Sequence, residues 1–175
     1  MKILERFYPC RMENSTYEIP FDEYRSLGYR GLIFDIDNTL VPHGAPAEER
    51  TIRLFERLRE LGFQTCLLSN NKEKRVKPFA GQVGSLYLSK GGKPAAAGYR
   101  KAMELMGTDP ESTLFVGDQL FTDVYGANRA GLYSILVRPI DPHEEIQIVL
   151  KRYLEKPVLC SYRAREEQKN RKGKR

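Results

Sequence analysis

The ten residues from Gly31 to Leu40 constrain the fold of this chain more than any other stretch. They read GLIFDIDNTL, an apolar run that ends in Asp35 and Asp37, with Thr39 just after. An almost unbroken apolar run of this length is typical of a buried parallel strand. Side chains two positions apart in an extended segment point to the same side, so the two carboxylates should emerge together where the strand ends.

Two carboxylates this close repel each other unless a cation, a shared proton or an anionic reaction centre lies beside them. Taken alone, the pair is a strand end with a solvated acidic turn, because short motifs need structural context. The functional interpretation makes Asp35 a nucleophile and Asp37 its acid/base partner next to a metal ion. The rest of the chain has to decide between these two interpretations.

The composition is that of a soluble globular domain. Hydrophobic residues are 41% and charged residues 30% of 175, which favours a single domain with a sizeable core. No apolar run approaches the ~20 residues of a membrane span, and the N-terminus has no signal-peptide core. The cysteines Cys10, Cys66 and Cys160 are widely spaced, which predicts free thiols in a reducing cytoplasm. His43 and His143 are expected in turns or on the surface.

The positive charge is concentrated at the C-terminus. Residues 151–175 hold ten Lys and Arg against three Glu, a net charge of +7, so residues 1–150 carry −1 of the total of +6. Such a tail is either solvated and disordered, or attracted to a polyanion such as anionic lipid head groups or nucleic acid. Interleaved aromatic residues would favour nucleic acid, and the tail offers only Tyr153 and Tyr162.

Apolar runs alternate with amphipathic segments from residue 29 onwards. We expect strands at 29–36, 63–69, 85–88, 113–116 and 132–137, and helices at 47–61, 71–79, 94–106, 121–130 and 143–154. Pro78 should kink or end the second helix. The alternation predicts an α/β fold, a doubly wound and mainly parallel sheet with helices on both faces.

We divide the chain into an N-terminal lead-in (1–28), a core domain (29–150) and a basic C-terminal tail (151–175). Ile3, Leu4, Phe7 and Tyr8 of the lead-in lie at helical spacing, so this segment can pack on the domain or lie on a membrane surface. A short turn of helix is expected near residues 21–27, closed by Gly28.

Polar residues follow each of the first four expected strands, at the edge of a parallel sheet where ligands bind. Ser69 and Asn70 follow the second strand, Lys93 the third, and Asp118 and Asp123 the fourth. Each has an ordinary explanation by itself, such as a helix cap or a helix N-terminal charge. Together they are the groups that phosphoryl transfer needs: a nucleophile, an anion-binding hydroxyl, a lysine and carboxylates for Mg²⁺.

These residues, in this order, resemble the four motifs of the haloacid dehalogenase (HAD) superfamily phosphatases. The motifs are Asp35-x-Asp37-Asn-Thr39, Ser69, Lys93 and Gly117-Asp118-x4-Asp123. The longer run GDQLFTDVYGANRAGLY, residues 117–133, is similar to a narrower branch, the YqeG-like subclass IIIA phosphatases, which includes phosphatidylglycerophosphate phosphatases. The resemblance implies a HAD-like Rossmannoid fold and a Mg²⁺-dependent phosphatase.

The resemblance also implies a role for each acidic residue. Asp35 attacks the phosphoryl group and becomes an aspartyl-phosphate. Asp37 protonates the leaving alcohol and then activates water, and its backbone carbonyl is a ligand of Mg²⁺. Asp118 completes the protein ligands of the metal, and Asp123 supports it through water or hydrogen bonds. Asp37 has no basic neighbour in the sequence, which suits it to acid work.

The remaining roles concern the phosphate and the turn. Ser69 and nearby backbone amides, with Asn70, hold phosphate oxygens, and Lys93 pairs with the nucleophile and the transferring group. Lys90 is a weaker candidate than Lys93 because it does not immediately precede the proline. Thr39 fixes the turn that carries both acids.

The gaps between motifs leave no room for the cap domain that many relatives carry. Residues 40–68 and 70–92 each hold one helix and one strand, so the fold should be cap-less and the site open. An open site suits a phosphate that projects from something large. With the basic tail and the amphipathic lead-in, this favours phosphatidylglycerophosphate at a membrane, reached from the cytoplasm by peripheral association with the inner face.

Other functions stay open at this point. The enzyme could act on nucleic-acid 3′-phosphates or on soluble sugar phosphates. A phosphoacceptor signalling module is also doubly wound and phosphorylated on Asp, but it would carry its acidic pair and its acceptor on different strands. A non-catalytic binding protein that keeps the fold is a further alternative, and the complete motif set argues against it.

Overall fold

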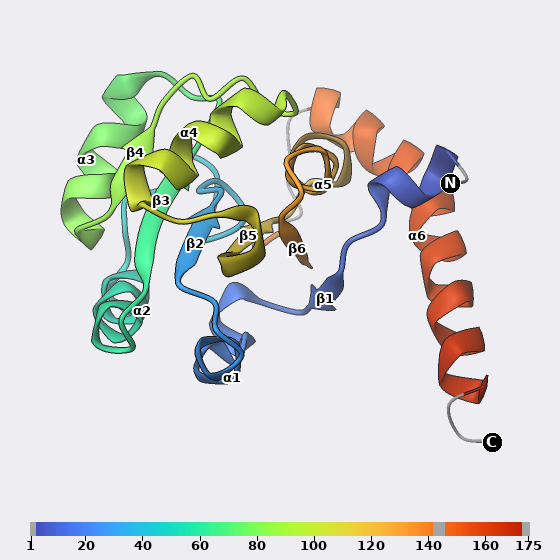
Figure 1. The fold of residues 1–175 in the computed structure, drawn as a ribbon. Coiled ribbons are helices and arrows are strands. Elements are labelled where there is room, and N and C mark those ends of the chain that lie inside the picture. Colours follow the sequence, from blue (N-terminus) through green and yellow to red (C-terminus); the bar gives the residue numbers. More distant parts are fainter. Residues whose placement is uncertain (1–2, 142–145, 173–175) are drawn as a thin grey trace.

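The computed structural model describes residues 3–141 and 146–172, with the backbone alone at 146–152, 170 and 172 (Figure 1). Within these residues, one parallel sheet has the strand order β1-β6-β5-β2-β3-β4. Its strands are β1 (Arg11–Glu13), β2 (Gly31–Phe34), β3 (Gln64–Leu68), β4 (Leu86–Leu88), β5 (Thr113–Gly117) and β6 (Tyr133–Val137). The five strands expected from the sequence are present; four are somewhat shorter than expected, and β5 is one residue longer.

Strand β1 is a sixth strand that the sequence analysis missed. It lies within the expected lead-in and pairs in parallel with β6 at the edge of the sheet, with Met12 opposite Leu136. Its three residues, Arg-Met-Glu, are exposed or half-buried, so this strand lacks the apolar run that predicts the buried central strands. The lead-in is therefore partly an edge of the domain.

Helices cover both faces of the sheet, as the doubly wound fold predicts (Figure 1). The short helix α1 (Phe21–Ser26), α2 (Glu49–Glu60) and α3 (Glu73–Val83) cover one face, where Phe34 of β2 packs with Phe55 and Phe79. Helix α4 (Ala96–Met106) and the short α5 (Tyr125–Arg129) cover the other, where Ile33 packs with Tyr99. Adjacent residues of β2 thus enter opposite cores, which is why its sequence is apolar throughout.

Helix α3 is longer than the helix expected at 71–79: Pro78 does not end it, and it continues to Val83. A proline inside a helix removes a hydrogen bond and costs about 3 kcal/mol. Here the side chains on the inner face of α3, Val76, Phe79, Ala80 and Val83, are all buried, and their burial offsets that cost. The helix ends instead at Gly84, whose φ of 66° is left-handed.

The segment expected as one helix at 121–130 consists of two pieces. A π-helical turn, Leu120–Val124, comes first and α5 follows. Helix α4 ends at Met106 as expected, with Gly107 in the left-handed conformation. Single helices connect β2 to β3 and β3 to β4, so residues 35–92 contain no cap domain.

The C-terminal helix α6 (Ile146–Lys172) is longer than expected and includes most of the basic tail. The first residues of the helix predicted at 143–154 lie outside the described residues. The described part of the tail, residues 151–172, is therefore helical and not disordered. Within the described residues, no helix is both long enough and apolar enough to cross a membrane.

The N-terminal segment packs against helix α6, which runs beside it in Figure 1. The hydroxyls of Tyr8 and Ser161 are 2.6 Å apart, and Arg165 forms an ion pair with Glu5 at 3.2 Å. The lead-in helix is a 3₁₀ turn, Ile3–Phe7, which packs through Phe7 and leaves Ile3 76% exposed. The expected packing on the domain is thus partial.

The cysteines give a direct test of the fold. Cys10, Cys66 and Cys160, all within the described residues, are free; Cys66 lies buried in β3, and the other two are exposed. Burial raises the pKa of the Cys66 thiol to about 12, so at neutral pH it is protonated and unreactive. We expect a thiol reagent at pH 7.5 to label Cys10 and Cys160 in the native protein, and all three in denaturant. Mass spectrometry measures this, and rapid native labelling of Cys66 would contradict the buried position of β3.

Candidate active site

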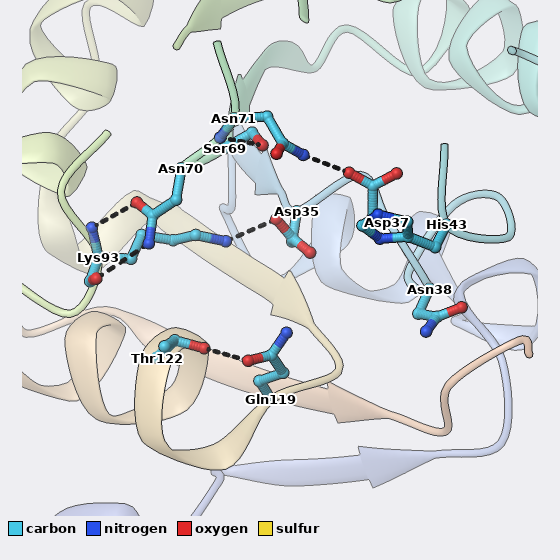
Figure 2. A pocket seen from close by; sticks show the side chains of 10 residues that line it. All are labelled: Asp35, Asp37, Asn38, His43, Ser69, Asn70, Asn71, Lys93, Gln119 and Thr122. Carbon is cyan, nitrogen blue, oxygen red and sulfur yellow. Dashed lines mark hydrogen bonds and ion pairs between the residues drawn. The ribbon is translucent and has the colours of Figure 1, made fainter. Parts of the chain in front are cut away.

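A pocket of about 200 Å³ lies at the carboxyl ends of the central strands (Figure 2). Strands β5, β2, β3 and β4 are neighbours, so the loops that follow them meet at one edge of the sheet. The residues that line the pocket are Asp35, Asp37, Asn38, His43, Ser69, Asn70, Asn71, Lys93, Gln119 and Thr122. The strand ends therefore converge as the sequence predicts.

The first loop turns sharply after β2. The Asp35 amide still continues the strand ladder and donates to the Val116 carbonyl at 2.9 Å. Asn38 then adopts a left-handed φ of 63°, and its amide donates to the Val41 carbonyl at 2.7 Å. This tight loop carries Asp37, and the Thr39 hydroxyl donates to Asp118 Oδ1 at 3.1 Å. The first and fourth motifs are thus joined directly.

Lys93 is the electrostatic centre of the site. Its Nζ donates to Asp35 Oδ1 at 2.6 Å and to Asp123 Oδ1 at 2.7 Å, and its side chain is only 4% exposed. Burial lowers the pKa of Lys93, but the charges of Asp123 and Asp35 outweigh burial, so the pKa is raised and Lys93 stays cationic. Burial raises the pKa of Asp35 to about 7, although the Lys93 charge acts in the opposite direction.

Asp37 lies in a different environment, turned away from Lys93 (Figure 2). Its Oδ1 accepts hydrogen bonds from the Gly44 amide at 2.8 Å and from Arg75 Nη2 at 2.9 Å, and its Oδ2 accepts one from Asn71 Nδ2 at 2.6 Å. Asp37 has no basic neighbour in the sequence, but in the structure Arg75 lies beside it. Arg75 reaches it from the first turn of α3, which packs beside the loop.

Three carboxylates lie close enough to hold one metal ion. Ligand oxygens of Asp35, Asp118 and Asp123 are all within 4.8 Å of one another, and all three residues are buried. With Lys93 included, the formal charge of these groups is −2, which a divalent cation would balance. The side chain of Asp37 is not among these three carboxylates.

Asn70 contacts another loop of the site with its side chain. Its Nδ2 donates to the Lys93 carbonyl at 3.0 Å, and its Oδ1 accepts from the Lys93 amide at 2.8 Å. One amide side chain therefore fixes the backbone of the lysine. Ser69 is buried beside it, and its Oγ accepts from the Asn71 amide at 3.2 Å. Lys90 does not line the pocket.

Asp123 is held by hydrogen bonds from its own turn and from helix α4. Its Oδ2 accepts from the Gln119 amide at 3.0 Å, while its backbone carbonyl accepts from the Tyr99 hydroxyl at 3.1 Å. Gly117 makes room for the carboxylate, because a Cβ there would lie 2.6 Å from Asp123 Oδ2. The glycine of the fourth motif is thus required by the close approach of Asp123.

Several pocket residues were not singled out as site residues from the sequence. Gln119 and Thr122 lie within residues 117–133, the run quoted for the resemblance, so the resemblance could have pointed to them as site residues. Asn71 and Arg75 are four residues apart, a spacing that places them on one side of a helix start, but nothing in the sequence shows that they face Asp37. His43 is an exposed turn residue, as predicted, and it also lines the pocket.

A doubly wound parallel sheet that gathers acidic residues and a buried lysine at its carboxyl edge has the architecture of a hydrolase acting on phosphate esters. Residues 49–131 match the family model described as a haloacid dehalogenase-like hydrolase. The chain is 33% identical, over 91% of its own length and 94% of the relative's, to the Bacillus subtilis protein named "Probable phosphatase YqeG". It belongs to the haloacid dehalogenase-like hydrolase family and is a phosphatase.

The chain is also similar to more distant proteins. The chain is 26% identical to the Arabidopsis thaliana "Phosphatidylglycerophosphate phosphatase 1, chloroplastic/mitochondrial" over 79% of its own length, and spans 45% of that relative. Among solved structures, the cobalt-bound deoxy-D-mannose-octulosonate 8-phosphate phosphatase of Haemophilus influenzae has a TM-score of 0.52 at 15% identity. That match covers 65% of this chain and 70% of the other, and it shows the fold alone.

The family membership decides between classes of protein. Phosphatases of this family generally use a divalent metal, and the buried aspartate cluster provides a place for one. Asp35 and Asp37 both follow the same strand, β2, unlike the arrangement expected of a phosphoacceptor signalling module. Neither that alternative nor a non-catalytic binding protein is supported.

The close approach at Gly117 yields a prediction. Gly117→Ala places a methyl group against the Asp123 carboxylate, so we expect the free energy of unfolding to fall by about 1–3 kcal/mol. Gly81→Ala in α3 is the control, because a Cβ there meets no atom within 4 Å, and Ala is favoured over Gly by about 1 kcal/mol inside a helix. Urea denaturation of both variants measures the difference. A Gly117→Ala protein as stable as Gly81→Ala would show that Asp123 does not need this space.

Proposed function

We propose that the chain is a Mg²⁺-dependent phosphomonoester hydrolase that works through an aspartyl-phosphate on Asp35. The observation that carries this proposal is the buried Lys93 bridging Asp35 and Asp123 at 2.6 and 2.7 Å. We further propose that the substrate is the phosphomonoester of a phospholipid head group, of the phosphatidylglycerophosphate type, on a cytoplasmic membrane face. The similarity to phosphatidylglycerophosphate phosphatases supports this finer assignment.

In the first step, an Asp35 carboxylate oxygen attacks phosphorus, and a bond forms between that oxygen and phosphorus. The bond from phosphorus to the ester oxygen breaks, and Asp37 gives its proton to the departing alkoxide. Lys93 stabilises negative charge on the phosphoryl oxygens, and Ser69 with nearby backbone amides holds the same oxygens. The products are the free alcohol and an acyl phosphate on Asp35.

In the second step, Asp37, now a carboxylate, takes a proton from water. The hydroxide attacks phosphorus, the bond between phosphorus and the Asp35 oxygen breaks, and inorganic phosphate leaves. Arg75, Asn71 and the Gly44 amide hold the Asp37 carboxylate while the proton moves, since all three already contact it. The acid and the base are then the same group in its two protonation states.

The carboxylates of Asp35 and Asp118 and the backbone carbonyl of Asp37 would hold Mg²⁺, with Asp123 in support. These are the oxygen ligands that Mg²⁺ prefers. When bound, the ion supplies positive charge that offsets the repulsion between the phosphate and the acidic cluster. Thr39 keeps Asp118 in register with the first loop through its hydrogen bond.

Asp35→Asn removes the nucleophile, so we expect the rate of phosphate release to fall by at least about 10³-fold. Asp118→Asn should instead raise the Mg²⁺ concentration needed for half-maximal activity, because one ligand is lost. Asp22→Asn is the control, since Asp22 has an exposed side chain 3.6 Å from Arg57, a kind of pair worth little. Phosphate release is assayed with a soluble aryl phosphate over a Mg²⁺ series. Substantial turnover by Asp35→Asn would exclude the aspartyl-phosphate mechanism.

The lipid assignment is supported by the site and by the exposed side chains of the N-terminal 3₁₀ turn and of α6. No cap domain separates the pocket from a large substrate. Ile3, Leu4, Tyr153 and Leu154 are exposed apolar or aromatic residues on the 3₁₀ turn and α6, and Arg163, Lys169 and Arg171 are exposed on α6. Basic residues near an anionic membrane contribute about 1 kcal/mol each, which favours peripheral attachment.

We expect phosphate release from vesicles that contain phosphatidylglycerophosphate and anionic lipid to exceed release from sugar phosphates and from 3′-phosphorylated oligonucleotides. A variant with Arg163, Lys169 and Arg171 changed to Gln should lose vesicle activity about tenfold or more and keep its activity on a soluble aryl phosphate. Parallel phosphate assays measure both. Fast release from sugar phosphates or oligonucleotides with none from vesicles would assign the enzyme to that substrate class instead.

A further inference from the structure

Helix α6 contacts the active-site framework through a buried carboxylate. Glu155 is 4% exposed, and its Oε1 accepts a hydrogen bond from the Leu120 amide at 2.7 Å. Leu120 begins the π-helical turn Leu120–Val124, directly after the pocket residue Gln119. The first amides of a helical turn have no acceptor within the turn, so they need one from elsewhere. Glu155 provides it from 35 residues away.

From this turn, hydrogen bonds lead directly to the nucleophile. The amide of Gln119, next to Leu120, donates to Asp123 Oδ2 at 3.0 Å. The other oxygen of Asp123 accepts from Lys93 Nζ at 2.7 Å, and Lys93 Nζ donates to Asp35 at 2.6 Å. Two successive amides are thus each fixed by a buried carboxylate, one from the turn itself and one from α6.

Apolar packing also attaches α6 to this turn. Val158, one turn after Glu155, is buried with Leu120 and Val124 in a small cluster beside the sheet. Burying a carboxylate is far less favourable than burying an apolar side chain, unless the carboxylate makes hydrogen bonds that matter. The bond from Glu155 to Leu120 therefore points to a role in fixing the turn as well as in attaching the helix.

We propose that Glu155 is a positioning residue of the phosphatase site. By holding the Leu120 amide, it sets the turn that carries Gln119 and Asp123, and through Asp123 it sets Lys93 against Asp35. The proposal rests on the function proposed above, since that function gives these three side chains their chemical roles. Under this proposal the C-terminal helix supports the geometry of the active site. This helix lies beyond residues 49–131, which match the family model.

The test compares Glu155→Ala and Glu155→Gln with two controls on the same helix. Val158→Ala loosens the packing of α6 on the turn but keeps the hydrogen bond between Glu155 and the Leu120 amide. Glu166→Gln removes a carboxylate that forms an ion pair with Lys169 at the surface. Amide hydrogen exchange at Gln119 and Leu120 is followed by NMR in metal-free protein. The kcat and KM for a soluble aryl phosphate are measured with saturating Mg²⁺.

We expect Glu155→Ala to speed exchange at both amides about tenfold or more relative to Val158→Ala, and to lower kcat by a similar factor with little change in KM. Glu155→Gln keeps an acceptor oxygen and should stay within about threefold of the wild type in both measurements. Glu166→Gln should match the wild type.

Exchange at Gln119 that is the same in Glu155→Ala and Val158→Ala would overturn the proposal, because Glu155 would then support the helix alone. An unchanged kcat in Glu155→Ala would overturn it equally. If the wild type releases no phosphate from any ester, the proposed function fails, and exchange at Gln119 still decides whether Glu155 positions Asp123.

Discussion

The buried ammonium group of Lys93 is the interaction on which the site depends. A lysine removed from water is unfavourable unless carboxylates surround it, and Asp35 and Asp123 do so from two different loops. The same contact joins the end of β2, the loop after β4 and the turn after β5. The strand order makes this possible, since β2 has β5 on one side and β3 on the other. One charge cluster therefore joins three of the loops that form the site.

The two aspartates of the first motif differ because their surroundings differ. Asp35 is buried against Lys93, and burial raises its pKa to about 7 before any metal charge is added. Asp37, two residues on, is held by Arg75, Asn71 and a backbone amide on the other side of the pocket. Two carboxylates within three residues of chain thus lie in different surroundings, which fits the different roles proposed for them, nucleophile and acid/base group.

Segments outside the central motifs complete the domain. Strand β1 extends the sheet beside β6, the 3₁₀ turn at the N-terminus packs on α6, and α6 reaches the turn that carries Asp123. The division into lead-in, core and tail stays a prediction. The first and last segments both contact the core by hydrogen bonds and apolar packing. The ends of the chain and the active site share one connected framework.

The sequence by itself determined the α/β class, five of the strands and the meeting of Asp35, Asp37, Ser69, Lys93 and Asp118 at one edge of the sheet. It could do so because apolar runs, helix periodicity and the polar residues just after each strand are local patterns. Only the tertiary structure decided that Arg75 faces Asp37, that Asn70 fixes the Lys93 backbone, that α3 continues past Pro78 and that Glu155 holds Leu120. These depend on contacts between segments distant in the chain or on burial of a whole helix face, and no short stretch of sequence encodes them.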